Sequence, residues 1–231
     1  KNQRSEGDEE NRQLVDALRA TQLDLQRRED DLRELEKLLN AKEQRLNGLE
    51  EELKKREARV KELEDIIAQK DAAVQALKDR IANALLGFKD KGLTVEERNG
   101  KIYVSLDAKL LFPSGSNVVN DEGKSALIDL ANVIREEKDI TIMVEGHTDT
   151  DPFNGAGAVK DNWDLSVMRA TSVVRILTGQ GKMSPDVLTA GGRGEHVPVA
   201  ENSTSEGKSK NRRIEIILAP NLDELFEIIN E

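Results

Sequence analysis

Apolar side chains recur at every seventh position through the first ninety residues, in one register without a break. The positions of this series are Leu18, Leu25, Leu32, Leu39, Leu46, Leu53, Val60, Ile67, Val74 and Ile81. No proline interrupts the stretch, and a sustained period of seven is typical of a left-handed coiled coil. At about 1.5 Å per residue, a helix over residues 9–86 would extend on the order of 115 Å.

The positions four residues before each of these alternate between leucine and a basic residue over most of the stretch. They are Leu14, Thr21, Arg28, Leu35, Lys42, Leu49, Arg56, Leu63, Lys70 and Leu77. The position that follows is acidic in most heptads: Glu29, Glu36, Glu43, Glu50, Glu57, Glu64 and Asp71. We expect the basic side chains to reach outward toward these carboxylates on a partner helix. Such layers cost stability but help to fix the register.

The predicted role of this helix is to hold two or more copies of the chain together as a homo-oligomer. The pattern leaves the number of strands open. A single solvated, charged helix is the alternative. A hairpin folded back on itself is disfavoured, because Gly48 alone is not a turn signal.

After residue 88 the period of seven gives way to shorter segments. Residues 93–106 are typical of a β-hairpin with Asn99 and Gly100 in a type I′ turn. The pattern then predicts helices over 119–137 and 165–178, and strands over 139–144, 187–190 and 212–218. This order predicts a two-layer α+β domain, with helices on one face of a mixed sheet.

The chain is therefore expected to have four parts. They are a disordered N-terminal segment at 1–8, a coiled-coil stalk at 9–88, a globular domain at 89–220 and a C-terminal amphipathic helix at 221–231. The stalk helix should stop near Gly87, since glycine is a good helix terminator.

Composition narrows the classes of function. Charged residues make up 35% of the chain and aromatic residues 3%, too few large apolar groups for one core along the whole length. The net charge of −10 argues against a nucleic-acid partner, which needs clustered Lys and Arg. The chain has no cysteine and no run of 18 apolar residues. Contact with a membrane is therefore expected only through an anchor outside this sequence.

The candidate chemistry lies in three segments of the globular part: GHTDT at 146–150, NWDLSVMRA at 162–170 and NRRIEI at 211–216. They place Asp149 at the end of a predicted strand and Arg169 in the helix that follows. An opposed carboxylate and guanidinium suit a ligand that carries both an ammonium and a carboxylate on one carbon. As alternatives, Asp149 could cap its own turn, and Arg169 could form a structural ion pair with Asp164 or Glu145.

Neither a metal site nor catalysis is expected from the residues. His147 lies near Asp149, but the only other histidine is His196, and the two lack a ligand spacing. Ser114 and Ser166 have no plausible neighbouring base. The prediction is a non-enzymatic binding protein without cofactor or metal.

The globular part resembles the OmpA-like peptidoglycan-binding family, which includes the C-terminal domains of OmpA, Pal and MotB. The matching segments are LFPSGS (111–116), VEGHTD (144–149), NWDLSVMRATSVVRIL (162–177), GGRGEHVPVAEN (191–202) and NRRIEI (211–216). The resemblance implies that Asp149 meets the ammonium of meso-diaminopimelate in the peptidoglycan stem peptide and that Arg169 meets its carboxylate. Further positions that match the family's ligand-binding residues are Thr148, Asn162, Leu165 and an arginine of the NRR segment, Arg212 or Arg213.

The segment after Asp149 departs from many family members, because residues 151–161 form a longer loop that looks more like the MotB branch. The function that this resemblance implies is tethering of the envelope to the cell wall through a coiled-coil spacer. The expected location is the periplasm, in association with the outer membrane of a Gram-negative bacterium. The alternative is the periplasmic part of a MotB-like motor or transport stator. A coiled-coil assembly protein whose globular domain no longer binds a ligand is a further possibility.

Overall fold

The computed structural model describes residues 2–137, 139–153, 155, 159–221 and 228. The chain divides into two compact units, residues 1–62 and residues 63–231. Helix α1 (Asn2–Ala84) contributes to both units and begins inside the segment 1–8 that the sequence analysis set apart. The predicted C-terminal helix at 221–231 lies almost entirely outside the described residues.

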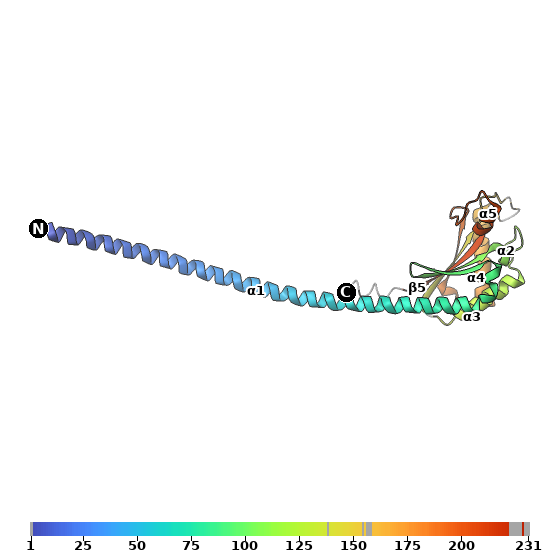
Figure 1. Ribbon diagram of the computed structural model, residues 1–231, viewed down its shortest axis with the longest axis horizontal. Coiled ribbons are helices and arrows are strands. Elements are labelled where there is room, and N and C mark those ends of the chain that lie inside the picture. The colour runs from blue at the N-terminus through green and yellow to red at the C-terminus, as the bar shows by residue number, and fades with distance from the viewer. Residues whose placement is uncertain (1, 138, 154, 156–158, 222–227, 229–231) are drawn as a thin grey trace. The chain divides into compact units, whose positions relative to one another are not determined.

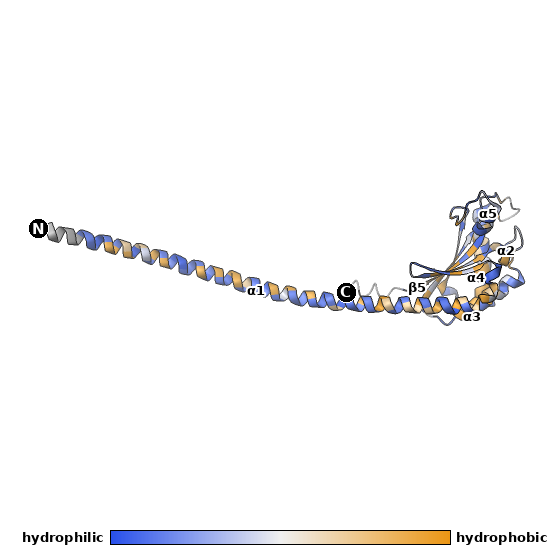
Figure 2. Cartoon of the chain, in the orientation of Figure 1, coloured by the Kyte–Doolittle hydropathy of each residue, from blue (hydrophilic) through white to orange (hydrophobic). Residues whose placement is uncertain are grey.

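The first unit consists of helix alone, and its apolar positions face solvent. Leu18, Leu25 and Leu32 of the seven-residue series are 61%, 59% and 59% exposed. Figure 2 shows apolar and polar residues interleaved along this part of α1. The basic side chains pair within the same helix, as Arg28 does with Asp24 at 3.1 Å between Nε and Oδ2. Such exposed ion pairs contribute little stability. The main feature of this unit is therefore its row of leucines, whose apolar side chains are exposed to solvent.

The last turns of α1 belong to the core of the second unit. Val74, Leu77, Ile81 and Leu85 are all buried, with Ile81 fully inaccessible. Val74, Leu77 and Ile81 continue the predicted heptad register. In this part of α1, the period of seven places apolar side chains in the core of the second unit. These side chains pack within one globular core, whereas the earlier members of the series are exposed.

The helix ends at Ala84 and is followed by a 3₁₀ turn, η1 (Leu86–Lys91). The left-handed residue that ends this connection is Gly92, with φ 88°, and not the predicted Gly87. A β-carbon at Gly92 would lie 2.3 Å from Oδ2 of Asp107. Glycine is therefore required at this position both by its backbone angle and by its close packing.

The second unit is built on a five-stranded mixed sheet, seen edge-on beside its helices in Figure 1. The strands are β1 (Leu93–Arg98), β2 (Lys101–Asp107), β3 (Ile140–His147), β4 (Leu188–Gly194) and β5 (Arg213–Pro220). Their order is β1-β2-β5-β3-β4, with β3 and β4 parallel and the other neighbours antiparallel. The predicted hairpin is confirmed, because Asn99 and Gly100 both have positive φ, at 53° and 69°, as a type I′ turn requires.

The predicted helices are also present, with shifted ends. They are α3 (Asp121–Ile134), capped by the side chain of Asn120, and α4 (Asn162–Gly179), capped by that of Asp161. Two short helices were not predicted, α2 (Ala108–Leu111) and α5 (Ser205–Asn211). The SEGKSKN sequence of α5 has no apolar period, so only its cap at Thr204 could have indicated it. A single 3₁₀ turn, η2 (Pro185–Val187), precedes β4.

Strand β5 shows how the sheet separates two environments. Ile214 and Ile216 lie in the apolar core, whereas Arg213 and Glu215 line a cavity on the opposite face. This alternation follows from the two-residue period of a strand. The fold is the predicted α+β architecture with a mixed sheet. Within the residues that the structure describes, no helix combines the length and apolar composition needed to cross a membrane.

Candidate ligand-binding site

A cavity of about 440 Å³ lies where the loop after β3, the start of α4, the loop after α2 and the residue before β5 converge. Six of the seven predicted site residues line it: Thr148, Asp149, Asn162, Leu165, Arg169 and Arg212. The structure thus brings together residues that lie far apart in the chain, from Thr148 to Arg212. Its walls combine the carboxylates of Asp149 and Asp151, the guanidinium groups of Arg169 and Arg212 and the ammonium of Lys109 with apolar side chains.

Asp149 is 4% exposed and uses both carboxylate oxygens. Oδ1 accepts a hydrogen bond from the backbone N–H of Asp151 at 3.1 Å, and Oδ2 accepts one from Nη1 of Arg212. The first bond is the turn-capping role that the sequence analysis left open. The bond to Arg212 makes Asp149 part of a charged pair inside the cavity. Asp149 therefore both caps its turn and contributes a charge to the cavity.

Arg169 reaches the cavity from the second turn of α4 and is 5% exposed. Its Nε donates to the carbonyl oxygen of Ser116 at 2.9 Å, and its guanidinium lies 5.0 Å from the ring centre of Phe112. Burial and the nearby Arg212 lower the pKa of Arg169 to about 10, while Asp149 acts in the opposite direction. Three cationic side chains line the cavity (Lys109, Arg169 and Arg212) against two carboxylates (Asp149 and Asp151), which favours an anionic ligand group.

The structural ion pairs considered for Arg169 are not formed. Among the described residues, Glu145 pairs with Arg193, and Asp164 accepts from the backbone N–H of Lys160. The guanidinium of Arg169 is held instead by a backbone carbonyl and an aromatic ring. This arrangement fixes its position without neutralising its charge.

The remaining wall residues orient the site. Asn162 donates through Nδ2 to the carbonyl oxygens of Asp149 and Asp151, at 3.3 and 3.0 Å, and so joins α4 to the loop after β3. Leu165 is buried and apolar. Oγ1 of Thr148 is buried and has no hydrogen-bond partner within the described part of the chain. A buried hydroxyl of this kind is costly unless something pairs with it.

Arg213 is not part of this cavity. Its Nε donates to Oε1 of Glu215 at 2.8 Å, on the opposite face of the sheet. The structure separates the two arginines that the sequence left as alternatives, because Arg212 precedes β5 and lines the cavity, whereas Arg213 begins the strand and points to the opposite face. Only Arg212 lies near Asp149.

The approach of α4 to β3 sets the separation between Asp149 and Arg169. Gly146 lies at the crossing, where a β-carbon would be 2.1 Å from the carbonyl oxygen of Ser166. Gly192 of β4 lies under the same helix, with Oγ of Ser166 at 2.3 Å from such a β-carbon. These two glycines allow the helix to pack directly on the strand backbones.

Sequence reasoning missed the aromatic walls of the cavity, Phe112 and Phe153. The chain has only four phenylalanines, so their position in loops next to the polar candidates was a signal. It also missed Lys208 of α5, whose Nζ lies 2.6 Å from Oδ1 of Asp151 at the rim. That contact depends on a helix that the sequence did not predict.

The histidines lie apart from this site. His147 lines the cavity on the other face of the sheet together with Glu145 and Glu215. His196 is exposed, and its ring centre lies 5.1 Å from that of Trp163. His147 and Asp149 are close in sequence but do not line the same cavity.

Comparison with known proteins matches residues 111–212 to the OmpA family. Motility protein B of Bacillus subtilis (strain 168) is 34% identical over 119 residues, which are 52% of this chain and 45% of that protein. The probable lipoprotein YiaD of Escherichia coli (strain K12) is 34% identical over 129 residues, 56% of each chain. The chain spans about half the length of these curated relatives.

A solved structure agrees with these matches over the globular part. The cell wall anchor of the T6SS from Pseudomonas aeruginosa has a TM-score of 0.56 and 32% sequence identity, and the match covers 62% of this chain and 98% of that one. The family match includes all the cavity residues from the loop after α2 to Arg212. The predicted resemblance is confirmed: residues 111–212 form an OmpA family domain, and motility protein B is among the relatives of this chain.

Proposed function

We propose that the globular domain binds peptidoglycan without cleaving it, through the diaminopimelate of the stem peptide. The OmpA family domain and similarity to a protein described as a cell wall anchor support this function. The site supports it independently of these relatives. A cavity with one buried carboxylate and two guanidinium groups is matched to a zwitterion with an excess of carboxylate.

The proposed binding mode follows from the charges. The ligand ammonium approaches the Asp149 carboxylate, and the ligand carboxylate approaches Arg169, whose buried charge has no carboxylate partner among the described residues. Arg212 pairs with Asp149 and also acts electrostatically on Arg169. Charge-assisted hydrogen bonds of this kind are strong and directional. Together they would read the relative positions of ammonium and carboxylate on one carbon.

The observation that carries the proposal is the buried, uncompensated guanidinium of Arg169 beside the Asp149–Arg212 pair. The test is a calorimetric titration of a stem peptide that contains meso-diaminopimelate into the full chain. The same peptide with L-lysine is the ligand control, because it keeps the ammonium and lacks the terminal carboxylate. We expect saturable binding of the first peptide and loss of about tenfold or more in affinity for the second.

Variants locate the binding. Asp149→Asn and Arg169→Gln should each abolish or strongly weaken binding. The first removes the negative charge proposed to meet the ligand ammonium, and the second removes the positive charge proposed to meet its carboxylate. Arg175→Gln is the matched control, because Arg175 lies on the same helix and is exposed. A folded wild-type chain that binds neither peptide would overturn the assignment, as would equal loss in the control.

We further propose that the exposed leucines of α1 are covered by a second copy of this chain. The apolar side chains at a period of seven are more than half exposed over most of the row, and such a row is typical of the seam of a coiled coil. Several copies on one stalk would then bind a repeating polymer much more tightly than one. This arrangement would tether the wall to an anchor at the N-terminal side.

Sedimentation velocity tests the oligomer. Leu25→Asn with Leu32→Asn places two amides in the seam and should yield monomers. Leu23→Asn is the control: Leu23 is also exposed, at 57%, but lies outside the seven-residue seam. A wild-type chain that sediments as a monomer at high concentration would refute the stalk assignment.

The second candidate is the periplasmic part of a motor or transport stator, favoured by the similarity to motility protein B. Both candidates place the domain in the cell envelope against the wall. They differ in what lies before residue 1 in the gene. A lipoprotein signal there supports an outer-membrane tether, and a membrane helix with an acidic residue supports a stator.

A further inference from the structure

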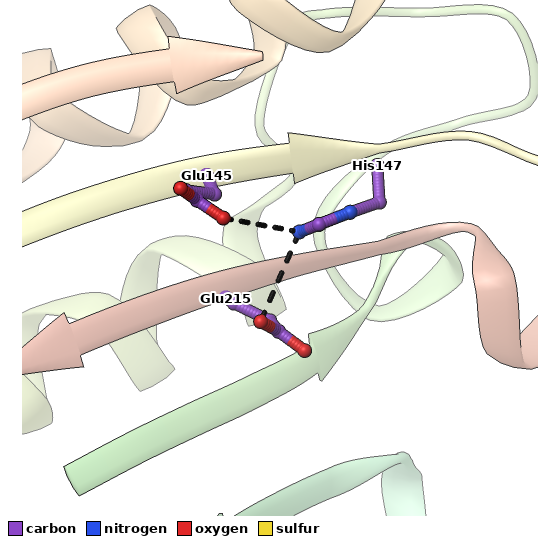
Figure 3. A group of neighbouring side chains, drawn as sticks. All are labelled: Glu145, His147 and Glu215. Carbon is purple, nitrogen blue, oxygen red and sulfur yellow. Dashed lines mark ion pairs between the residues drawn. The ribbon is translucent and has the colours of Figure 1, made fainter. Parts of the chain in front are cut away.

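A second cluster of buried titratable groups lies on the face of the sheet opposite the ligand cavity (Figure 3). Glu145 and His147 are alternate residues of β3 and so point to the same side, and Glu215 is the cross-strand partner of Glu145 on β5. One ligand atom from each of the three residues lies within 4.8 Å of the others. All three side chains are more than nine-tenths buried.

In each of the two carboxylates, one oxygen pairs with an arginine and the other faces His147. Oε1 of Glu145 accepts from Arg193 at 2.8 Å, and Oε1 of Glu215 accepts from Arg213 at 2.8 Å. The Oε2 atoms face His147 instead. Two acids directly opposite each other on neighbouring strands repel one another. A positive charge between the two Oε2 atoms would therefore stabilise the sheet.

His147 is the unexplained member of the cluster. Its Nε2 lies 3.7 Å from Oε2 of Glu145 and 3.8 Å from Oε2 of Glu215, too far for hydrogen bonds. Neither ring nitrogen has a hydrogen-bond partner in the described part of the chain. The imidazole is 2% exposed and is aimed between the two carboxylates.

We propose that Glu145, His147 and Glu215 form a binding site for a divalent transition-metal ion, with Zn²⁺ as the best fit. Imidazole nitrogen and carboxylate oxygen are ordinary zinc ligands, at about 2.0–2.2 Å. In a tetrahedral set such ligands lie about 3.4 Å apart. The histidine lies 3.7 and 3.8 Å from the two carboxylates, and all three ligand atoms lie within 4.8 Å of one another, so the side chains must draw closer to hold an ion. The two carboxylates direct negative charge toward the ion, against the positive charge of Arg193, Arg213 and Arg98, whose Nη2 lies 4.0 Å from Oε1 of Glu215.

The surroundings fit a modest site. The three residues line a cavity of about 560 Å³, but both ring nitrogens of His147 are buried, so an ion reaches them only when the side chains move. Arg193 and Arg213 hold the outer oxygens and so orient both carboxylates, as hydrogen bonds to metal ligands commonly do. Their charges also repel a cation, so we expect weaker binding than at a dedicated zinc site. The proposal does not depend on ligand binding at the other face.

The test uses the full chain, purified without a histidine tag and stripped with a chelator. Zn²⁺ is titrated in a calorimeter, with Mn²⁺ and Ca²⁺ as comparison ions. We expect one Zn²⁺ per chain and a rise in the melting temperature of the globular domain. Glu215→Gln and His147→Gln should each weaken Zn²⁺ binding by about tenfold or more. His196→Gln is the matched control and should bind normally, since His196 is the only other histidine.

Spectroscopy of the wild-type chain removes the dependence on folding of the variants. With only two histidines, the ¹⁵N resonances of His147 and His196 can be assigned from the His196→Gln spectrum alone. Zn²⁺ should shift Nε2 of His147 and leave His196 unchanged. Absence of one-to-one Zn²⁺ uptake by the folded chain, or uptake that shifts only His196, would overturn the proposal. Loss of peptidoglycan binding with intact Zn²⁺ uptake would affect only the proposed function.

Discussion

Nη1 of Arg212 contacts Oδ2 of Asp149, although the two residues lie 63 positions apart in the chain. The contact joins the loop after β3 to the residue that precedes β5. Asp149 is almost fully buried, while the Arg212 side chain is 31% exposed. Arg212 can therefore respond to a ligand at the mouth of the cavity while Asp149 stays fixed.

Two neighbouring arginines should differ in their effect on peptide binding. Arg212→Gln removes a charge-assisted contact from the ligand cavity, so affinity for the diaminopimelate peptide should fall by about 10- to 100-fold. Because Asp149 is also buried and loses this partner, the melting temperature should fall as well. Arg213→Gln leaves the buried Glu215 without its closest partner, so the free energy of unfolding should fall by about 3 kcal/mol or more. Calorimetry and thermal denaturation of both variants provide the comparison. Equal effects of the two changes on peptide affinity would contradict the assignment of Arg212 to the site.

Gly146→Ala should weaken ligand binding by displacing helix α4. The new methyl group would lie 2.1 Å from the carbonyl oxygen of Ser166, so α4 must move away from β3. We expect a loss of about 1–3 kcal/mol in stability and a larger loss of ligand affinity, because Arg169 moves with the helix. Gly179→Ala is the control, since a β-carbon there has nothing within 4 Å. Unchanged affinity in a folded Gly146→Ala variant would show that the helix position does not control the site.

The last turns of α1 should be required for folding of the globular domain. A chain that starts at residue 89 lacks the buried Val74, Leu77, Ile81 and Leu85, so we expect it to be unstable, whereas one that starts at residue 63 should fold.

Single substitutions refine this test of the domain boundary. Ile81→Ala should cost about 2–5 kcal/mol, and Val118→Ala, at a position 69% exposed and outside the stalk, should cost less than about 0.5 kcal/mol. Urea denaturation followed by circular dichroism measures both. A stable chain from residue 89 would show that the helix end is dispensable.

Acid should destabilise the metal-free domain through His147. Burial lowers the pKa of His147 to about 4, with Arg213 and Arg193 acting in the same direction and Glu215 and Glu145 opposing them. The unfolded chain, with an ordinary histidine pKa of about 6.5, takes up this proton at a higher pH than the folded chain. Lowering the pH from about 6.5 to about 4 should therefore reduce the free energy of unfolding by roughly 3 kcal/mol.

The measurement is denaturation across this pH range in the presence of a chelator. His147→Gln isolates the effect, because other groups also titrate as the pH falls. The difference in stability between wild type and variant should shrink from pH 6.5 toward pH 4. A difference that stays constant would contradict the assignment.

The elements that local sequence controls were predictable. Asn99 and Gly100 specify their turn because both tolerate positive φ, and the alternation on either side specifies the two strands of the hairpin. Helices α3 and α4 follow from their apolar period and their capping residues. The grouping of Asp149 with Arg169 could be predicted because both lie in segments shared with a known family.

Other features depend on contacts between distant parts of the chain, which the sequence pattern does not encode. Leu32 and Ile81 occupy equivalent positions of one seven-residue period, yet the first is 59% exposed and the second is fully buried. The period specifies only that one side of a helix is apolar, and the sheet decides which turns of that side it covers.

The two faces of the sheet were likewise decided by the tertiary structure. The sequence by itself determined the hairpin, the helices, the stalk pattern and the set of polar candidates, because these depend on neighbours a few residues apart. The pairing of β3 with β5 directed Arg212 to one cavity and Arg213 to the other, and it placed Glu215 opposite Glu145 beside His147. Strand register fixes such choices, because a shift of one residue would exchange the faces, and register is set only when the whole core packs.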